Sequence, residues 1–423
     1  MIKVSFYTIG CKLNQYETQL ISERLERRGF KRVDWGQDAD LYIINSCTVT
    51  HRAAADSRRK VYAAKRISPR AKIVVTGCYA QIEREKLSSM EEIDLVIGND
   101  QKEDIIDKLA GLFPGIPIVS PHNDDKSVRG LYKHTRALIK IQDGCNQNCS
   151  YCIIPRGRGR ERSRGFEDII EEIKIVCENG FQEIVLTGVH IGRYSFNRHD
   201  LTDLLRIILE ETDVKRIRLS SVEVNELSDE LIDLAAKNSR ICPHFHVPLQ
   251  SGSDKILKNM NRPYTTDQYL KRVDCVKSKI DNVMVGADVI VGFPGEGEGE
   301  FAKTIAFVEN SPIDYLHVFS YSDHPRASSY NFDGKVAANE IKKRNRILTG
   351  LGDSKWNSFL AAQLKHNLSV LIEKRFAQNS KRLTGLSDNY IRVEIEGSDS
   401  MFNTIRMVKP LEICSKKIIG KLS

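Results

Sequence analysis

The sequence of 423 residues lacks any apolar stretch long enough for a signal peptide or a membrane helix, and it has no long repeat or low-complexity tract. These absences argue against a membrane protein and favour a cytoplasmic one. Glycine and proline are also modest, at 27 and 12 residues, while 41% of the residues are hydrophobic, so the chain is folded and globular. At this length we expect two or three domains and not one core.

Cysteine is present in number, with ten residues in the chain. In a reducing compartment these are not expected to form a disulfide framework, and clustered cysteines are better explained as metal ligands or catalytic thiols. Cys145, Cys149 and Cys152 form a C-x3-C-x2-C pattern directly after the strand-like run 137–141. Three thiolates in one loop can hold three corners of a four-iron cluster and leave one iron open for chemistry.

Two alternatives compete with cluster binding at this loop. Cys149 and Cys152 could form a dithiol redox pair, but Cys145 would then be surplus. A structural zinc site would be expected to recruit a fourth protein ligand, and none is obvious nearby. The pattern therefore favours a cluster, and with it an enzyme.

Three further cysteines lie in the first part of the chain, where strand and helix signals alternate as in an open parallel α/β sheet. Strands are expected at 4–9, 41–44 and 72–76, and a helix at 14–28 ends at Gly29. Cys11, Cys47 and Cys78 each follow one of these strands directly. Because parallel strands end at one edge of a sheet, the three thiols should converge there. The alternative is three small buried residues near strand ends.

Composition and periodicity divide the chain into three domains. Residues 1–112 form the α/β sheet domain, and proline, glycine and charge at 113–130 indicate a linker. Residues 131–362 carry six strand candidates with helices between them, which predicts a partial (β/α)6 barrel. Residues 363–423 are predicted to be a small all-β barrel with Gly385 and Gly397 at turns. The barrel strands are expected at 137–141, 183–189, 216–221, 244–249, 283–291 and 315–321, its helices include 166–179, 227–236 and 265–280, and the C-terminal strands are expected at 368–374, 390–395 and 403–408.

Several other residues are candidates for function. The net charge of +8 permits a nucleic-acid partner, and five arginines follow the cysteine loop. Such a run is often only a solvated loop, but arginine forks suit phosphate oxygens. Polar residues also follow the barrel strands, where such folds place their chemistry. The arginines are Arg156, Arg158, Arg160, Arg162 and Arg164, and the strand-end candidates are Gly188, Ser220, Glu223 and Asp288. The isolated cysteines, which are Cys177, Cys242, Cys275 and Cys414, are interpreted as ordinary packing residues.

These motifs together resemble a known family. The C-x3-C-x2-C loop, with an aromatic residue before its last cysteine, resembles the radical S-adenosylmethionine superfamily. The three earlier cysteines and a C-terminal module similar to the TRAM domain narrow the resemblance to the methylthiotransferases. The segment Gly10-Cys-Lys-Leu-Asn-Gln-Tyr-Glu-Thr18 is similar to the branch that acts on N6-threonylcarbamoyladenosine next to the tRNA anticodon.

The resemblance implies two [4Fe-4S] clusters and S-adenosylmethionine as cofactors. Cys145, Cys149 and Cys152 would hold the cluster that binds and reductively cleaves S-adenosylmethionine, and Cys11, Cys47 and Cys78 would hold a second cluster that carries or donates sulfur. Gly188, Ser220, Glu223 and Asp288 would contact the cofactor.

The implied partners are tRNA, held by the five arginines and the C-terminal module, and a low-potential electron donor of the flavodoxin or ferredoxin type. We expect a monomeric cytoplasmic enzyme without a membrane partner. The alternative substrates are isopentenyladenosine in tRNA and a ribosomal protein side chain. A zinc-bearing RNA-binding protein without catalysis is the remaining alternative.

Overall fold

The first part of the chain folds into a five-stranded sheet in the computed structural model, which describes residues 1–113, 128, 135–376 and 381–423. The strand order is β2-β1-β3-β4-β5, and all four neighbouring pairs are parallel. The three predicted strands are present, and the sequence missed the short strands β2 and β5. The bounds are β1 (Lys3–Thr8), β2 (Lys31–Val33), β3 (Leu41–Ser46), β4 (Lys72–Gly77) and β5 (Leu95–Ile97).

Helices cover both faces of this sheet because its central strands are apolar on both sides. Ile43 of β3 packs towards one layer of helices, whereas its neighbours Tyr42 and Ile44 pack towards the other. One layer contains α1 (Lys12–Glu26) and α5 (Ile105–Ala110), and the other contains α2 (His51–Ile67), α3 (Cys78–Ile82) and α4 (Arg84–Ser88). The predicted stop after α1 is confirmed: Gly29 has a φ of +81°.

The second lobe contains six parallel strands in two groups of three, ordered β10-β9-β6 and β11-β12-β13. Parallel bridges between Ile217 and Ile241 and between Ser221 and His246 join the two groups into one curved arc. All six predicted strands are present, which confirms the partial barrel. The bounds are β6 (Arg136–Lys140), β9 (Glu183–Thr187), β10 (Arg216–Leu219), β11 (His244–His246), β12 (Met284–Val291) and β13 (Tyr315–Ser320).

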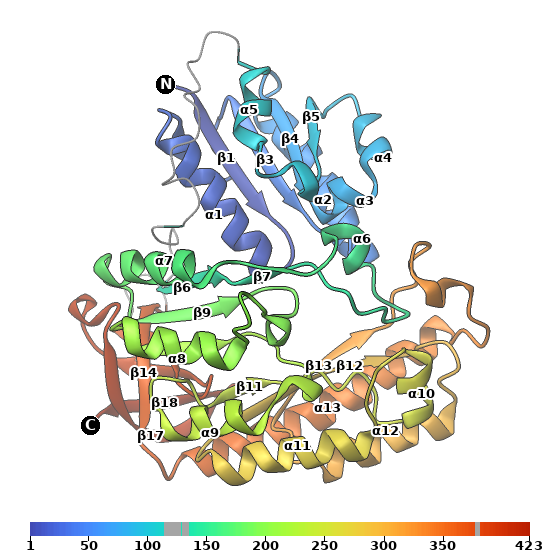
Figure 1. Cartoon of the computed structure of the whole chain (residues 1–423), viewed down its shortest axis with the longest axis vertical. Coiled ribbons are helices and arrows are strands. Elements are labelled where there is room, and N and C mark those ends of the chain that lie inside the picture. The colour runs from blue at the N-terminus through green and yellow to red at the C-terminus, as the bar shows by residue number, and fades with distance from the viewer. Residues whose placement is uncertain (114–127, 129–134, 377–380) are drawn as a thin grey trace.

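The helices of this lobe lie outside the arc and share its apolar core, as expected for strand–helix units (Figure 1). The predicted helices 166–179, 227–236 and 265–280 correspond to α7, α9 and α11. The bounds are α7 (Phe166–Glu178), α8 (Leu201–Glu211), α9 (Asp229–Lys237), α10 (Asp254–Asn259), α11 (Thr266–Lys279), α12 (Glu298–Asn310) and α13 (Ala338–Gln363).

The C-terminal module is a closed barrel with the order β14-β15-β16-β18-β17. The sequence predicted β14, β16 and β17 but missed β15 and β18. The prediction that Gly385 lies at a turn is wrong. Gly385 lies inside β15, where a Cβ atom would lie 2.4 Å from the Leu371 oxygen. Gly397 follows β16 as expected. The bounds are β14 (Leu368–Arg375), β15 (Arg382–Ser387), β16 (Arg392–Glu396), β17 (Ile405–Cys414) and β18 (Lys417–Leu422).

This small barrel packs on the long helix α13, whose Trp356 Nε1 donates to the Lys416 oxygen at 3.0 Å. Figure 1 shows the first lobe above the partial barrel, with the short helix α6 (Ile154–Arg158) between them. Of the predicted linker, only residues 113 and 128 are described, so the domain boundaries stay a prediction. Among the described helices, none combines the length and apolarity needed to cross a bilayer.

Candidate active site

The structure places Cys11, Cys47 and Cys78 at one edge of the N-terminal sheet. They follow β1, β3 and β4, which are neighbours in the sheet. Two glycines permit the close approach of these loops. A Cβ atom on Gly10 would lie 3.0 Å from the Cys47 Cβ, and one on Gly77 would lie 2.4 Å from the Ser46 oxygen. We call these three residues the N-terminal triplet.

Two of these thiols are poor nucleophiles without a bound cation. Burial, with smaller contributions from the neighbouring thiols Cys78 and Cys11, raises the pKa of Cys47 to about 11. Burial likewise raises the pKa of Cys78, although the nearby Arg158 lowers it. A bound metal is the usual way to hold such buried groups as thiolates.

Cys145, Cys149 and Cys152, here called the loop triplet, lie between β7 (Gln142–Asp143) and α6. Each sulfur accepts a hydrogen bond from an N–H group, an arrangement that suits a thiolate. The Gln147 nitrogen lies 3.3 Å from the Cys145 Sγ, the Ile154 nitrogen 3.5 Å from the Cys152 Sγ, and a guanidinium nitrogen of Arg262 3.3 Å from the Cys149 Sγ. The loop is held from behind by the segment after α10, because the Ser150 nitrogen donates to the Met260 oxygen at 3.0 Å.

Arg262 is a site residue that sequence reasoning missed. Its side chain is only 2% exposed, and it pairs with Glu223, one of the predicted cofactor contacts. Burial raises the pKa of Cys149 even though Arg262 opposes the shift. Burial also raises the pKa of Cys152 to about 12. A lone arginine more than a hundred positions after the loop carries no local signal, because only the barrel fold brings the two together.

The spacing of the sulfur atoms bears on which metal these cysteines fit. In a tetrahedral zinc site with Zn–S bonds of about 2.3 Å, the sulfurs lie about 3.8 Å apart. Within the described ranges, neither triplet brings its three sulfurs within 4.8 Å of one another. In a four-iron cluster each cysteine ligates a different iron, so the sulfurs of either triplet need not come that close together.

His190 and Glu226 extend the loop triplet into the barrel. The His190 Nδ1 lies 3.7 Å from the Cys145 Sγ, and its Nε2 lies 2.7 Å from a Glu226 carboxylate oxygen. Although burial opposes it, hydrogen bonds to Cys145 and Glu226 raise the pKa of His190 to about 9. His190 lies two residues after the candidate Gly188, in the turn that follows β9.

Of the other strand-end candidates, Gly188 and Ser220 directly follow β9 and β10, whereas Asp288 lies inside β12 and not at its end. Gly188 lies close to the backbone of Gln142, which precedes the loop triplet. A Cβ atom on Gly188 would lie 2.8 Å from the Gln142 oxygen, so a larger residue would not fit there. The buried Ser220 Oγ has no hydrogen-bond partner among the described residues. The Asp288 carboxylate lies 3.0 Å from the His246 Nε2 and 3.2 Å from the His317 Nδ1. That Gly188, Ser220, Glu223 and Asp288 contact a cofactor stays a prediction.

The arginine run does not form one exposed loop, which corrects the expectation from sequence. Arg156, Arg160 and Arg162 are exposed, but Arg158 lies in α6 with a side chain only 1% exposed. Arg164 is partly buried and pairs with Glu172 at 2.5 Å. Arg158 and Arg164 therefore pair with internal carboxylates, and RNA contact by the arginine run stays a prediction.

Three of the four isolated cysteines pack as predicted. Cys242 is buried, and Cys177 and Cys275 lie partly buried against the barrel core. Cys414 is exposed at the end of β17, so the packing prediction is wrong for this residue.

Comparisons with known proteins agree with this arrangement. Residues 139–308 match the radical SAM superfamily, and residues 3–98 match an uncharacterized protein family, UPF0004. The fold is similar to that of the radical S-adenosylmethionine methyltransferase TsrM from Kitasatospora setae. That structure has a TM-score of 0.55 at 16% identity, with 75% of this chain and 73% of that chain covered. The second lobe is thus the barrel of a radical S-adenosylmethionine enzyme.

Full-length relatives define the family more narrowly. The threonylcarbamoyladenosine tRNA methylthiotransferase MtaB of Aquifex aeolicus is 35% identical over 416 residues, covering 96% of this chain and 100% of the relative. The protein of the same name from Bacillus subtilis is 35% identical over 431 residues, covering 97% and 94%. The chain belongs to the radical S-adenosylmethionine methylthiotransferase family, and it is an enzyme of the transferase class.

Proposed function

We propose that this enzyme adds a methylthio group to C2 of N6-threonylcarbamoyladenosine, next to the anticodon of tRNA. The observation that carries the proposal is that the two cysteine triplets lie close together in space, at the two ends of the short helix α6. Cys152 stands just before the helix, and near its end a Cβ atom on Gly157 would lie 3.4 Å from the Cys78 Cβ. Five helical residues span only about 7–8 Å. A radical source and a sulfur source would thus face one substrate.

Each triplet would hold one [4Fe-4S] cluster. When bound, the cluster at the loop triplet supplies reductive cleavage of S-adenosylmethionine, and the cluster at the N-terminal triplet supplies the sulfur. The protein's own residues orient the cysteine side chains. Arg262 and two backbone N–H groups donate to the loop sulfurs, and His190 contacts the Cys145 sulfur. A radical route suits the reaction because C2 of adenine offers no easy leaving group for polar substitution.

Lys12 supports the choice of an acidic substrate. It follows Cys11 directly, and burial lowers the pKa of its ammonium group. Within the described part of the chain it forms no hydrogen bond or ion pair, and its charged surroundings include the cations Arg136 and Arg218 and the carboxylate of Glu183. A half-buried ammonium group without an ion pair favours an anionic ligand. The threonylcarbamoyl group carries a carboxylate, whereas an isopentenyl group carries no charge.

The RNA would contact the exposed arginines and the C-terminal barrel. Arg156, Arg160 and Arg162 lie on the surface beside the loop triplet. On β17, Arg406 and Lys409 are exposed, as is Met407 with 49% of its surface accessible. Positively charged groups suit the phosphates of RNA, and apolar groups suit unstacked bases. The target base must leave the anticodon stack to reach the clusters. A flavodoxin or ferredoxin would donate electrons to this monomeric, cytoplasmic enzyme.

Mass spectrometry of tRNA nucleosides tests the substrate. A deletion strain should lack the 2-methylthio derivative of threonylcarbamoyladenosine, and the gene should restore it. Loss of methylthiolated isopentenyladenosine, or of a methylthiolated ribosomal protein, would support one of the alternative substrates instead. Protein prepared without oxygen should contain iron and sulfide, and zinc alone would exclude the enzymatic role.

A variant of Lys12 tests how the substrate is recognised. We expect Lys12→Met to raise the KM for tRNA at least about 30-fold, the scale for losing one partner of a buried charge pair. Cleavage of S-adenosylmethionine without tRNA should be unchanged. Lys271→Met, which alters an exposed lysine on α11, is the matched control. An unchanged KM in Lys12→Met would contradict recognition of a carboxylate by this residue.

A further inference from the structure

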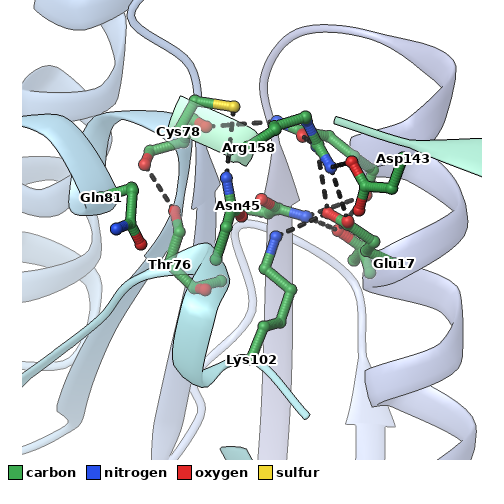
Figure 2. Close-up of polar contacts among 12 residues, drawn as sticks. Glu17, Asn45, Thr76, Cys78, Gln81, Lys102, Asp143 and Arg158 are labelled. Atoms are coloured by element: carbon green, nitrogen blue, oxygen red, sulfur yellow. Dashed lines mark hydrogen bonds and ion pairs between the residues drawn. The ribbon is translucent and has the colours of Figure 1, made fainter. Parts of the chain in front are cut away.

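Arg158 occupies the contact between the two lobes. Its guanidinium lies 2.8 and 3.2 Å from the two carboxylate oxygens of Glu17, a bidentate pairing across the lobes. The same group lies 3.2 Å from an oxygen of Asp143 and 2.5 Å from the Asn14 Oδ1. Figure 2 shows Arg158, Lys102 and Asp143 gathered around Glu17. Sequence reasoning had assigned Arg158 to RNA, but its side chain is only 1% exposed.

The partners of Arg158 in the first lobe are neighbours of the N-terminal triplet. Asn14 lies three residues after Cys11, and its Nδ2 donates to the Ile9 oxygen at 2.7 Å and to the Ser46 oxygen at 3.2 Å. It thus joins the loop of Cys11 to the residue before Cys47. Contact with Asn14 places Arg158 against two of the three cysteine loops.

The third cysteine of that triplet is reached through the residue before Arg158. The Gly157 oxygen accepts a hydrogen bond from the Asn99 Nδ2 at 2.6 Å, and the same Nδ2 lies 3.4 Å from the Cys78 Sγ. A Cβ atom on Gly157 would lie 3.4 Å from the Cys78 Cβ and 3.7 Å from its Sγ, so this part of α6 lies close to Cys78.

The loop triplet is tied to Arg158 from the other side. Asp143 stands two residues before Cys145, and its carboxylate accepts the Gly144 nitrogen at 2.8 Å while it pairs with Arg158. Helix α6, which carries Arg158, begins two residues after Cys152. One guanidinium therefore connects the loops of both triplets, through Asn14 on one side and Asp143 on the other.

The charges around Arg158 leave an excess of positive charge beside the N-terminal triplet. Glu17 also lies 2.5 Å from the Lys102 ammonium and 3.7 Å from that of Lys140, and Asp143 lies 2.8 Å from Lys140. Three buried or partly buried cations thus face two carboxylates. Although burial alone would raise it, these cations hold the pKa of Glu17 well below its usual range. The remaining positive charge favours anionic ligands at Cys78.

We propose that Arg158 is a positioning residue that sets the placement of one cysteine triplet relative to the other and adds positive charge beside the N-terminal triplet. The inference rests on the proposed function, because sulfur transfer requires the two cofactor sites to face a common substrate. It predicts that loss of Arg158 uncouples the two half-reactions instead of weakening both equally.

The coupling experiment compares Arg158→Gln with Arg158→Lys and with Arg206→Gln, which alters an exposed arginine on α8. Each protein is loaded with iron and sulfide, and both 5′-deoxyadenosine and methylthiolated tRNA are measured. In Arg158→Gln we expect normal cleavage of S-adenosylmethionine and about 100-fold less product per cleavage, the scale for misplacement by an ångström. Lysine keeps the positive charge but cannot form the bidentate pairing of a guanidinium, so in Arg158→Lys product formation should stay partly uncoupled from cleavage. Arg206→Gln should match the wild type.

A spectroscopic readout separates charge from activity. With Cys145, Cys149 and Cys152 replaced by Ala, only the N-terminal triplet binds a cluster, and its midpoint potential can be followed by electron paramagnetic resonance. Removing the positive charge in Arg158→Gln should lower this potential, whereas Arg158→Lys should stay close to the parent. An unchanged potential in Arg158→Gln would overturn the electrostatic part of the proposal.

Two further outcomes decide the positioning part. If cleavage and product fall in parallel in Arg158→Gln with both clusters present, or if neither changes, Arg158 does not position the sites. If this variant does not fold, Asn14→Ala takes its place, since it removes the link to the Cys11 loop and leaves the ion pairs intact. It should uncouple to a smaller degree, and an unchanged ratio would overturn the proposal. Absence of methylthiolated tRNA from the wild type would instead contradict the proposed function. The midpoint potential of the N-terminal cluster would still test the electrostatic role of Arg158.

Discussion

The two cysteine triplets differ in how the chain builds them. The loop triplet spans eight residues of sequence, and its geometry is set by one loop with hydrogen bonds to each sulfur. The N-terminal triplet is collected from three parallel strands, with two glycines that permit the loops to approach. A local motif keeps its spacing in any fold that preserves the loop. A triplet assembled from separate strands depends on the register of the whole sheet.

Replacing the cysteines tests this comparison most strongly. The triple variant Cys145→Ala, Cys149→Ala, Cys152→Ala should lose cleavage of S-adenosylmethionine entirely, because no iron is left open for it. The triple variant Cys11→Ala, Cys47→Ala, Cys78→Ala should keep this cleavage but form no methylthiolated product. Each should bind about half of the wild-type iron. Iron analysis and chromatography of 5′-deoxyadenosine measure both effects, and Cys414→Ser should leave them unchanged.

The buried ion pairs between the triplets predict the next largest effect. Glu17→Gln leaves Arg158 and Lys102 without their shared carboxylate, which should lower the free energy of unfolding by about 3–5 kcal/mol at neutral pH. Because the folded-state pKa of Glu17 lies below its unfolded value of 4.5, its contribution is present above that pH and is lost as the pH falls further. Urea unfolding at several pH values should therefore show the gap between wild type and Glu17→Gln narrowing below about pH 4.5. A gap that widens in acid would contradict this account.

Glycine substitutions sharpen the comparison because they can damage one triplet at a time. A Cβ atom on Gly77 would meet the Ser46 oxygen at 2.4 Å, and one on Gly144 would meet the Arg160 oxygen at 2.0 Å. Both have positive φ, so alanine should cost about 1–3 kcal/mol through strain alone. Gly77→Ala should deplete the N-terminal cluster and Gly144→Ala the loop cluster, as judged from iron content. Gly29→Ala has a similar φ but open space, so it should lower stability without loss of iron.

The smallest expected effect concerns the arginines that follow the loop triplet. Arg156→Gln and Arg160→Gln should each reduce the salt dependence of tRNA binding by about one unit of slope if each contacts one phosphate. Cleavage of S-adenosylmethionine without tRNA should not change. Binding measured between low and moderate salt provides the slope. An unchanged slope in both variants would place the RNA elsewhere on the surface.

The sequence predicted elements best where a pattern is local. All six barrel strands were expected, because each is a short β-branched run followed by a helical pattern. In the C-terminal module, β15 and β18 were missed, since their pairing depends on distant strands. Gly385 was placed at a turn because glycine usually marks one, but its role is to let β14 approach β15.

The arginine run shows the limit of the same reasoning at the site. Five arginines in nine residues are one feature in the sequence, but the fold gives them different roles. Arg158 is buried because helix α6 turns it towards Glu17, whereas Arg156 and Arg160 stay exposed. A distant carboxylate cannot be inferred from the run itself. Arg262 was missed for the same reason, since its contact with Cys149 exists only in the folded barrel.

The sequence by itself determined the loop triplet, the three cysteines at strand ends and the resemblance to the methylthiotransferases, because those signals lie in residue type and short spacing. Only the tertiary structure decided that α6 lies between the two triplets, that Arg158 binds their loops and that Lys12 lacks a partner among the described residues. The contacts of Arg158 with Glu17 and Asn14 join residues more than a hundred positions apart. They form because the packing of two lobes buries opposite charges together, and no periodicity along the chain encodes that pairing.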